Sequence, residues 1–447
     1  MSDPPDVGAG APGVRGTALV LGAMLVPVSL GITAISVATG PLAADLGLTD
    51  AEAVWVLAGY VLAHAISLAT LGRLGDTHGL AVVLRITVVL LAVGSVLAAT
   101  SGSLPALVAG RVVQGLGAGG MPVVVFGVVG LRFRRPQQVA VLATVTAMLG
   151  IVSGAGSLVG GALSDLAGWR AVVALPVLSV LPAALVLRTL PPPAAVGQRV
   201  DLVGAAVVAI WASALVLLLE SPSVDLATTT LVLLVAVVAA TSGLLVHRIR
   251  TRPDGFVPAA VVGSRRFVLG ALAAATTYCA YVALLFAAPL MLLRDHDWST
   301  TTVGLVLLPA AAVGAVAARV VGRLIRTRDP FRVAAVLAGS SAAGMLVAGV
   351  ADGAPVPTTI GLSLVLTGFI ASQGGLVAHV PLALPAELRS VATGIFQLAA
   401  LVGGALGSAV VAGLSSPIGL GAAVACIAVV PAVGVGLALA AGAVGGP

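Results

Sequence analysis

The sequence predicts an all-α integral membrane protein with fourteen transmembrane helices, arranged as two six-helix bundles and one inserted helix pair. Three observations predict this fold class. Of the 447 residues, 59% are hydrophobic and only 9% are charged, with a mean hydropathy of +1.18. Apolar runs of about 20 residues, long enough to cross a bilayer, recur along the chain. The basic residues gather in alternate connections between these runs.

The apolar runs set the predicted helices. Counting them along the chain gives fourteen, at approximately 17–40, 52–72, 80–100, 104–130, 138–163, 170–190, 201–220, 226–247, 267–292, 302–325, 331–350, 356–380, 390–413 and 417–443.

A weak internal repeat sets the predicted domains. The segment from Gly322 to Arg326 echoes the segment from Gly72 to Gly75, and each follows the second run of a six-run set. Parallel repeats of this kind are typical of transporters built from two similar halves. We therefore predict a disordered cytoplasmic tail, a first bundle, a linker with inserted helices seven and eight, and a second bundle, with limits 1–16, 17–190, 191–250 and 251–447.

The arginines predict the topology. All 22 basic residues are arginine. With the N-terminus inside, Arg170 and Arg294 fall outside and Arg111 lies within a span. The other arginines all fall on the cytoplasmic side, which agrees with the positive-inside rule and places both termini in the cytoplasm. They are Arg15, Arg73, Arg85, Arg132, Arg134, Arg135, Arg188, Arg199, Arg248, Arg250, Arg252, Arg265, Arg266, Arg319, Arg323, Arg326, Arg328, Arg332 and Arg389.

Other function classes find little support in the sequence. The net charge of +6 is spread over loops rather than one soluble face, so we expect no nucleic-acid partner. No metal-spaced His/Cys cluster, nucleophile elbow or phosphate loop occurs. We therefore expect neither an enzyme nor a bound metal or cofactor, and we expect a monomer in the bilayer. Many Ala, Val and Gly residues without lysine are typical of a GC-rich bacterial gene, which indicates a bacterial cell membrane.

A short polar segment between the second and third runs carries the first motif, Gly72, Arg73, Asp76 and Gly79. Gly72 allows close helix approach, and Asp76 can cap a helix or meet its dipole. An ordinary cytoplasmic turn explains the segment equally well. The segment resembles the loop between the second and third helices of the major facilitator superfamily, which implies a latch between two bundles. The basic residues that usually follow the last glycine are absent here.

Arg111 and Gln114 form the second candidate site, one turn apart in the fourth run. A charge at that depth is costly and normally meets a partner or a water-filled cavity. A snorkelling arginine is the alternative. The stretch resembles the family's fourth-helix motif, which implies a link between Arg111 and proton transfer.

Glycines in the fifth run give a smooth face for helix packing, at Gly156, Gly160 and Gly161. The stretch resembles the antiporter signature, with Gly156–Ser157 where the family has glycine–proline. A packing seam and a coupling role are equally compatible with it. Fourteen spans with an inserted pair resemble the drug:proton antiporter branch of the superfamily. This resemblance implies multidrug efflux, antibiotic resistance, and alternating access to export small apolar molecules.

The sequence lacks the acidic residues that this family usually carries within its membrane helices. Gly31 stands where the first helix usually carries an aspartate, and no Asp or Glu lies in the middle of a predicted span. The remaining candidate proton carriers are His64 and His379, because histidine titrates near neutral pH. A lone histidine in a helix is, however, more often a hydrogen-bonded packing residue. Polar residues that could line a substrate cavity are Tyr60, Gln373 and Gln397. The departures leave two alternatives open: a transport-inactive membrane sensor or scaffold of the same fold, and an uncoupled facilitator.

Overall fold

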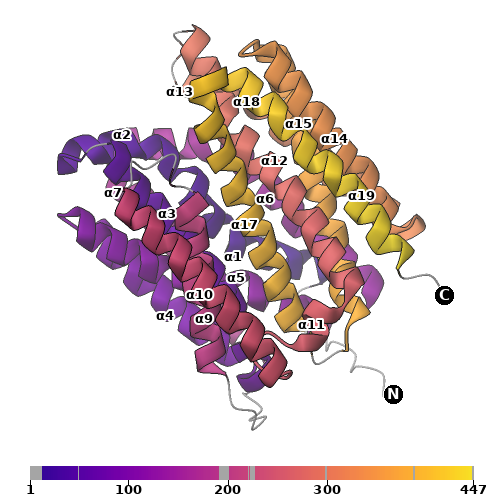
Figure 1. Ribbon diagram of the computed structural model, residues 1–447. Helices are drawn as coiled ribbons and strands as arrows, with labels where there is room; N and C mark the ends of the chain where they lie inside the picture. Colours follow the sequence, from indigo (N-terminus) through magenta and orange to yellow (C-terminus); the bar gives the residue numbers. More distant parts are fainter. Residues whose placement is uncertain are drawn as a thin grey trace.

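The computed structural model describes residues 13–48, 50–190, 201–219, 221, 227–296, 298, 300–385 and 388–444, apart from some side chains within them, and all its regular elements there are helical (Figure 1). The first half contains α1 (Val14–Thr33), α2 (Ile35–Leu46), α3 (Asp50–His78), α4 (Leu80–Ala99), α5 (Leu104–Arg132), α6 (Arg135–Ala167), α7 (Trp169–Ala174) and α8 (Val180–Leu187). The next pair is α9 (Leu202–Leu219) and α10 (Thr228–Thr251). The second half contains α11 (Ala259–Gly263), α12 (Arg265–His296), α13 (Thr300–Thr327), α14 (Pro330–Ala351), α15 (Pro355–Ala371), α16 (Val377–His379), α17 (Arg389–Ile418), α18 (Leu420–Ile427) and α19 (Val429–Ala443).

Three spans are interrupted rather than continuous. A 3₁₀ turn, Leu175–Ser179, joins α7 to α8. A π-helical turn, Ser372–Leu376, joins α15 to α16, and a second 3₁₀ turn, Val380–Ala383, follows it. A kink at Ala34 separates α1 from α2. Of the predicted disordered tail at 1–16, residues 1–12 lie outside the described residues, whereas Val14 to Gly16 already belong to α1, so this part of the prediction was wrong. The proline linker at 191–200 also lies outside the described residues.

Within the described chain, twelve helical stretches have the length and apolarity needed to cross a bilayer, against the fourteen predicted. The two predicted spans without a match are 138–163 and 201–220, where α6 and α9 lie. α6 has 33 residues, but its apolar portions, Ala140–Leu149 and Leu158–Ala167, are short. In α9 the apolar portion is Val203–Leu219. The expected count of fourteen is not met because neither helix contains an unbroken apolar stretch of the required length among its described residues.

Apolar side chains cover the outside of the helical body. Leu166, Val336 and Val350 are examples, each at least 70% exposed. Such a surface is unstable in water and stable in lipid, where helices also satisfy their own backbone hydrogen bonds. The chain is therefore a multi-pass membrane protein.

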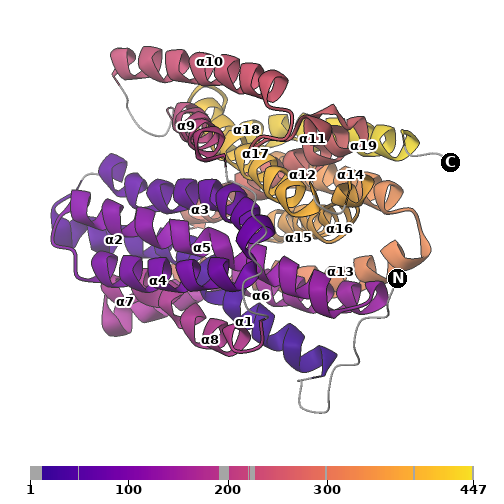
Figure 2. The same ribbon diagram turned by 90° about the horizontal axis from the view of Figure 1, so that it is seen from below.

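The two halves meet along two equivalent seams. α6 of the first half packs along α13 of the second half, and α3 packs along α17 (Figure 2). α3 and α13 are the second long helices of their halves, while α6 and α17 are the fifth. Each seam therefore joins a second helix to a fifth helix, as expected for two repeated halves.

The inserted pair covers only one of these seams. α9 packs against α3 and α17, so it touches both halves. α10 packs chiefly against α9, lies at the periphery in Figure 2, and has no buried residue. The pair is thus attached to the α3–α17 flank, while the α6–α13 flank lies on another side of the body.

Glycine pairs four residues apart seat both fifth helices on the first helix of their own half. In α6, a Cβ at Gly156 would lie 2.1 Å from Thr33 Oγ1, and one at Gly160 would lie 2.3 Å from the Ala34 carbonyl oxygen. In α17, a Cβ at Gly403 would lie 2.3 Å from the Ala275 carbonyl oxygen, and one at Gly407 would lie 2.2 Å from that of Cys279. These contacts are possible only without side chains. Gly161, the third predicted member, is partly exposed.

The polar segment predicted as a loop is mostly helix. α3 continues through His78, and α4 begins at Leu80. Gly79 alone makes the turn, with φ of 83°. That conformation is open to glycine and unfavourable for residues with a Cβ. The loop prediction was wrong because the helix extends beyond its apolar run, where solvent can satisfy polar side chains.

The two arginines outside the predicted pattern are both neutralised by acids. Arg170 Nη1 donates to Asp45 Oδ2 at 2.8 Å. Arg294 donates to Asp295 through Nε at 2.8 Å and to Asp352 through Nη2 at 3.2 Å. The positive-inside rule counts Lys and Arg rather than net charge, so these two arginines remain exceptions to it.

The Asp45 pair gives a pH prediction. Hydrogen bonds from Arg170, and then from Trp169, lower the pKa of the Asp45 carboxyl from its ordinary value of 3.8. Since the folded state favours the carboxylate, its stabilisation is complete above about pH 4 and disappears as the pH falls through the lowered pKa. We expect Asp45→Asn to lower the unfolding temperature slightly at pH 7 and by less near pH 3.

Differential scanning fluorimetry of the purified protein in detergent measures this effect. Asp165→Asn is the matched control, because Asp165 is exposed and has no side-chain partner among the described residues. An equal loss of stability in both variants, or the same loss at both pH values, would contradict the assigned role of the Asp45–Arg170 pair.

Candidate functional site

Arg111 and Gln114 lie on one face of α5, three residues apart, and both are completely buried. The fourth predicted span therefore directs a full positive charge into the interior of the first bundle. No part of the guanidinium reaches the surface. Of the two expected environments for this charge, a partner or a water-filled cavity, the described residues supply partners, which are protein groups around the side chain.

Three of the five guanidinium N–H groups of Arg111 make hydrogen bonds. Nε donates to the Val56 carbonyl of α3 at 3.0 Å. Nη1 donates to Gln114 Oε1 at 2.6 Å, and Nη2 donates to the Gly31 carbonyl of α1 at 2.7 Å. The fork of the arginine thus joins α1, α3 and α5.

Gln114 extends the network to two further helices. Its Nε2 donates to Ser95 Oγ of α4 at 2.7 Å and to the Val173 carbonyl of α7 at 2.9 Å. The Gln114 side chain therefore links the arginine to the outer helices of the bundle. Sequence reasoning missed Ser95, although a serine inside a long apolar run is a signal that could have identified it.

The Gly31 carbonyl occupies the position where the family's usual aspartate is missing. Gly31 lies in the last turn of α1, where carbonyls lack partners within their own helix and can accept from outside. A Cβ at Gly31 would lie 2.7 Å from Pro176 Cγ and 3.2 Å from Tyr60 Oη, so an aspartate would need neighbouring groups to move. A backbone dipole therefore replaces the carboxylate as the partner of Arg111.

Tyr60 completes the surroundings of the charge. Its ring centre lies 4.1 Å from Arg111 Cζ, within the range of a cation–π contact. Its hydroxyl donates to the Val28 carbonyl at 3.0 Å, and the whole side chain is buried. Tyr60, predicted as a cavity residue, belongs to the arginine network.

The two predicted histidines lie in different halves. His64 follows Tyr60 by one turn of α3, with ring centres 6.2 Å apart, and its buried Nδ1 has no hydrogen-bond partner among the described residues. His379 lies in α16 and is partly exposed, with Nδ1 2.8 Å from the Gly375 carbonyl. The structure does not bring the two rings together.

The remaining polar candidates are spread over the second half. Gln397 in α17 is partly buried, and its Oε1 has no partner among the described residues. The Gln373 side chain lies outside the described residues, although its backbone forms part of the π-helical turn. At the start of that turn, Ser372 Oγ accepts a hydrogen bond from Thr277 Oγ1 at 2.7 Å, which joins α12 to the π-helical turn.

The motif at the end of α3 reaches the segment after α10. Arg73 Nη2 makes a long hydrogen bond of 3.4 Å to the Asp254 carbonyl. Thr77 Oγ1 lies 2.8 Å from His78 Nδ1 and bonds back to the Arg73 carbonyl. The Asp76 side chain lies outside the described residues. Arg73 thus contacts the connection from the inserted pair.

Comparisons with known proteins agree with this architecture. The family model of the Major Facilitator Superfamily matches residues 19–408. The tetracenomycin C resistance and export protein of Streptomyces glaucescens is 30% identical over 419 residues, which cover 90% of this chain and 76% of that protein. The uncharacterized transporter YebQ of Escherichia coli is 26% identical, with 84% of each chain covered. The solved structure of the proton:xylose symporter XylE has the same fold, with a TM-score of 0.65, 16% identity and 94% of each chain covered.

Proposed function

Since the chain belongs to the Major Facilitator Superfamily and is a membrane transporter, we propose that it exports small, fairly apolar molecules such as drugs or secondary metabolites. The observation that carries this proposal is the similarity, over 90% of the chain, to a tetracenomycin C resistance and export protein. Alternating access would proceed by rocking of the two halves about the α3–α17 and α6–α13 seams.

The charge distribution supports an uncharged substrate. No acid lies in the middle of a predicted span, so nothing there would neutralise a cation. Arg111 is enclosed by its own bundle, so in this conformation it offers no charge to an anion. We therefore assign Arg111, Gln114 and Tyr60 to the framework of the first bundle, and substrate contact to other residues.

Drug accumulation in cells tests the export proposal. Cells that express the protein should accumulate less of at least one apolar compound from a panel than cells that express a poorly transporting Arg111→Lys variant at equal membrane levels. Equal accumulation of every compound would favour the alternative of a membrane sensor or scaffold, which the missing acids also support.

Proton coupling is the finer part of the proposal, and the histidines are its candidate carriers. His64 has an unpartnered ring nitrogen, whereas His379 is already bonded to a carbonyl, so His64→Gln should cause the larger loss. The measurement is transport into proteoliposomes under an imposed pH gradient. Gradient-driven transport that survives both His64→Gln and His379→Gln would rule out histidine coupling. Transport by the parent that does not respond to the pH gradient would indicate an uncoupled facilitator or a coupling ion other than the proton.

We also propose that α6 and α9 span the membrane, giving fourteen spans in all, as in the drug:proton antiporter branch. The length of α6, at 33 residues, and its packing against α1 and α13 support this. α9 has 18 residues and packs against α3 and α17. Both termini would then lie in the cytoplasm of a bacterial cell, and the bundles would occupy 17–190 and 251–447.

Reporter fusions test the topology. Fusions placed after Asp225 and after Asp352 should both report an external location, since each follows an odd number of spans. A fusion after Arg134 serves as the internal control. An internal signal after Asp225 would mean that one of the two helices α6 and α9 does not cross the membrane, and would exclude the fourteen-span arrangement.

A further inference from the structure

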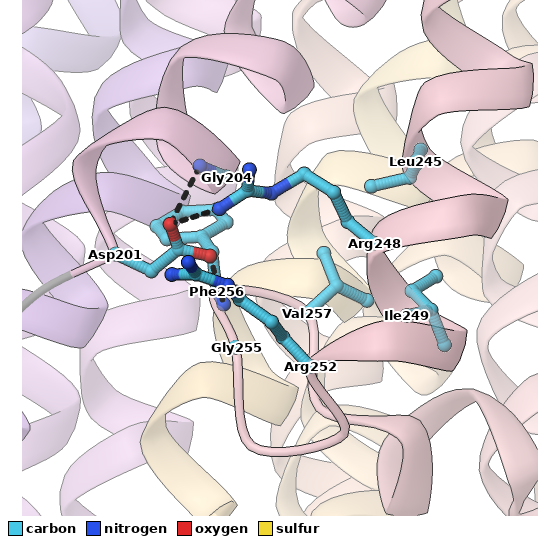
Figure 3. Close-up of a pocket in the computed structure, with 9 residues that line it drawn as sticks. All are labelled: Asp201, Gly204, Leu245, Arg248, Ile249, Arg252, Gly255, Phe256 and Val257. Carbon is cyan, nitrogen blue, oxygen red and sulfur yellow. Dashed lines mark hydrogen bonds and ion pairs between the residues drawn. The ribbon is translucent and has the colours of Figure 1, made fainter.

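A recess lies where the inserted pair meets the chain that leads into the second half (Figure 3). α9 and the residue before it contribute Gly204 and Asp201. The last turns of α10 contribute Leu245, Arg248, Ile249 and Arg252, and the following segment contributes Gly255, Phe256 and Val257. Arg73, from the end of α3, reaches the same segment at Asp254. The recess therefore lies at the arginine-rich end of the molecule.

Asp201 holds the recess together and has little capacity for other partners. Its Oδ1 accepts from Gly204 N at 3.0 Å and from Arg248 Nη2 at 2.6 Å, while its Oδ2 accepts from Phe256 N at 3.2 Å. Burial favours the neutral acid, but the two backbone hydrogen bonds and the Arg248 charge outweigh it, so the pKa of Asp201 lies below its ordinary value. The carboxylate remains ionised and neutralises one guanidinium.

Positive charge remains after this pairing. Arg248 and Arg252 line the recess, Arg73 reaches the segment beside it at Asp254, and Arg250 lies in the same last turns of α10, against the carboxylates of Asp201 and Asp254. Arg250 and Arg252 are exposed, and neither side chain has a partner among the described residues. The Nε of Arg248 is buried and likewise has no partner there. Unpaired guanidinium N–H groups at a membrane surface attract phosphate oxygens.

The apolar side of the recess continues onto the surface of α10. Leu245, Ile249 and Val257 line the recess beside the arginines. Further along α10, Val235, Leu244 and Val246 are exposed by 44% or more. A basic recess that opens onto an apolar helix face has the two chemical features of a phospholipid, an anionic headgroup and an acyl chain.

We propose that this recess binds an anionic phospholipid. Arg248 and Arg252 contact the headgroup phosphate, Arg250 supplies long-range attraction, and an acyl chain lies along the exposed face of α10. The bound lipid covers part of the exposed surface of α10, which packs chiefly against α9. The lipid site does not depend on the direction of transport or on the transported compound.

Lipid retention by the purified full-length protein tests this proposal. Native mass spectrometry in detergent should show more bound phosphatidylglycerol than phosphatidylcholine with the same acyl chains. The double variant Arg250→Gln/Arg252→Gln should reduce phosphatidylglycerol affinity by about thirtyfold, because each of the two guanidiniums near a membrane surface contributes about 1 kcal/mol. Arg248 is left in place, since its loss would also free Asp201.

The matched control is Arg328→Gln/Arg332→Gln, which removes two exposed arginines near the turn between α13 and α14. The control should retain phosphatidylglycerol like the parent. An equal loss of phosphatidylglycerol affinity in the control, or an unchanged preference for phosphatidylglycerol in the Arg250/Arg252 variant, would contradict the proposed lipid site. Competition by glycerol 3-phosphate at the lipid's own affinity would assign the recess to soluble phosphates and overturn the lipid proposal. Because the readout is lipid retention, failure of drug export leaves this result unaffected.

Discussion

Arg111→Ala is expected to abolish transport and to destabilise the first bundle. The substitution leaves the Gly31 and Val56 carbonyls and Gln114 Oε1 without their donor in a fully buried site. Hydrogen bonds to a charged group contribute about 1.5–3 kcal/mol each, so the expected loss of stability is at least about 3 kcal/mol. Transport in proteoliposomes and thermal unfolding in detergent measure the two effects.

Arg111→Lys separates a loss of folding from a loss of function. Lysine keeps the positive charge but carries a single ammonium group in place of the planar guanidinium. It therefore cannot donate at the same time to the carbonyls of α1 and α3 and to the Gln114 side chain. We expect this variant to reach the membrane with a smaller loss of stability and to transport at a strongly reduced rate. Normal transport by Arg111→Ala would show that the network has no part in function.

Gly160→Ala and Gly407→Ala are expected to destabilise the protein by about 1–3 kcal/mol each, as overpacking does. The added methyl carbon would lie 2.3 Å from the Ala34 carbonyl oxygen in the first case and 2.2 Å from that of Cys279 in the second. Backbone atoms cannot rotate aside, so the fifth helix must move away from the first. Because the two sites lie in different halves, the effects on the free energy of unfolding should be additive in the double variant.

The control for both is Gly130→Ala in α5, where a Cβ would meet nothing within 4 Å. Alanine is favoured over glycine in a helix by about 1 kcal/mol, so the control should be neutral or stabilising. Opposite signs for the same chemical change would identify helix contact as the cause. Unchanged or raised unfolding temperatures for Gly160→Ala and Gly407→Ala would contradict the close packing described here.

Much of the architecture follows from the sequence because a bilayer leaves the chain few choices. Backbone groups in lipid must be satisfied internally, so long apolar runs predict helices directly. Among the described residues, twelve such helices are present by length and apolarity. The run at 138–163 falls short because the apolar part of α6 is divided into two short stretches, and the run at 201–220 falls short because the apolar stretch of α9, Val203–Leu219, is itself too short.

Periodicity also identified part of the site. Arg111 and Gln114 are three residues apart, which places both on one helix face, and the structure joins them directly. The glycine spacing in the fifth run predicted a packing face, and Gly156 and Gly160 do contact the end of the first helix. Both predictions depend on the spacing of residues within one helix, and this spacing can be read directly from the sequence.

Only the tertiary structure decided the partners across helices. The acceptors of Arg111 are backbone carbonyls of Gly31 and Val56, and every residue has a carbonyl, so no residue type marks them. The same holds for the contact of Arg73 with Asp254 and for the position of α9 across the α3–α17 seam. By itself the sequence determined the helices, their apolar faces and the buried charge, because these depend on local composition and the bilayer. The neighbours of that charge, and the recess beside α10, depend on how distant segments pack together.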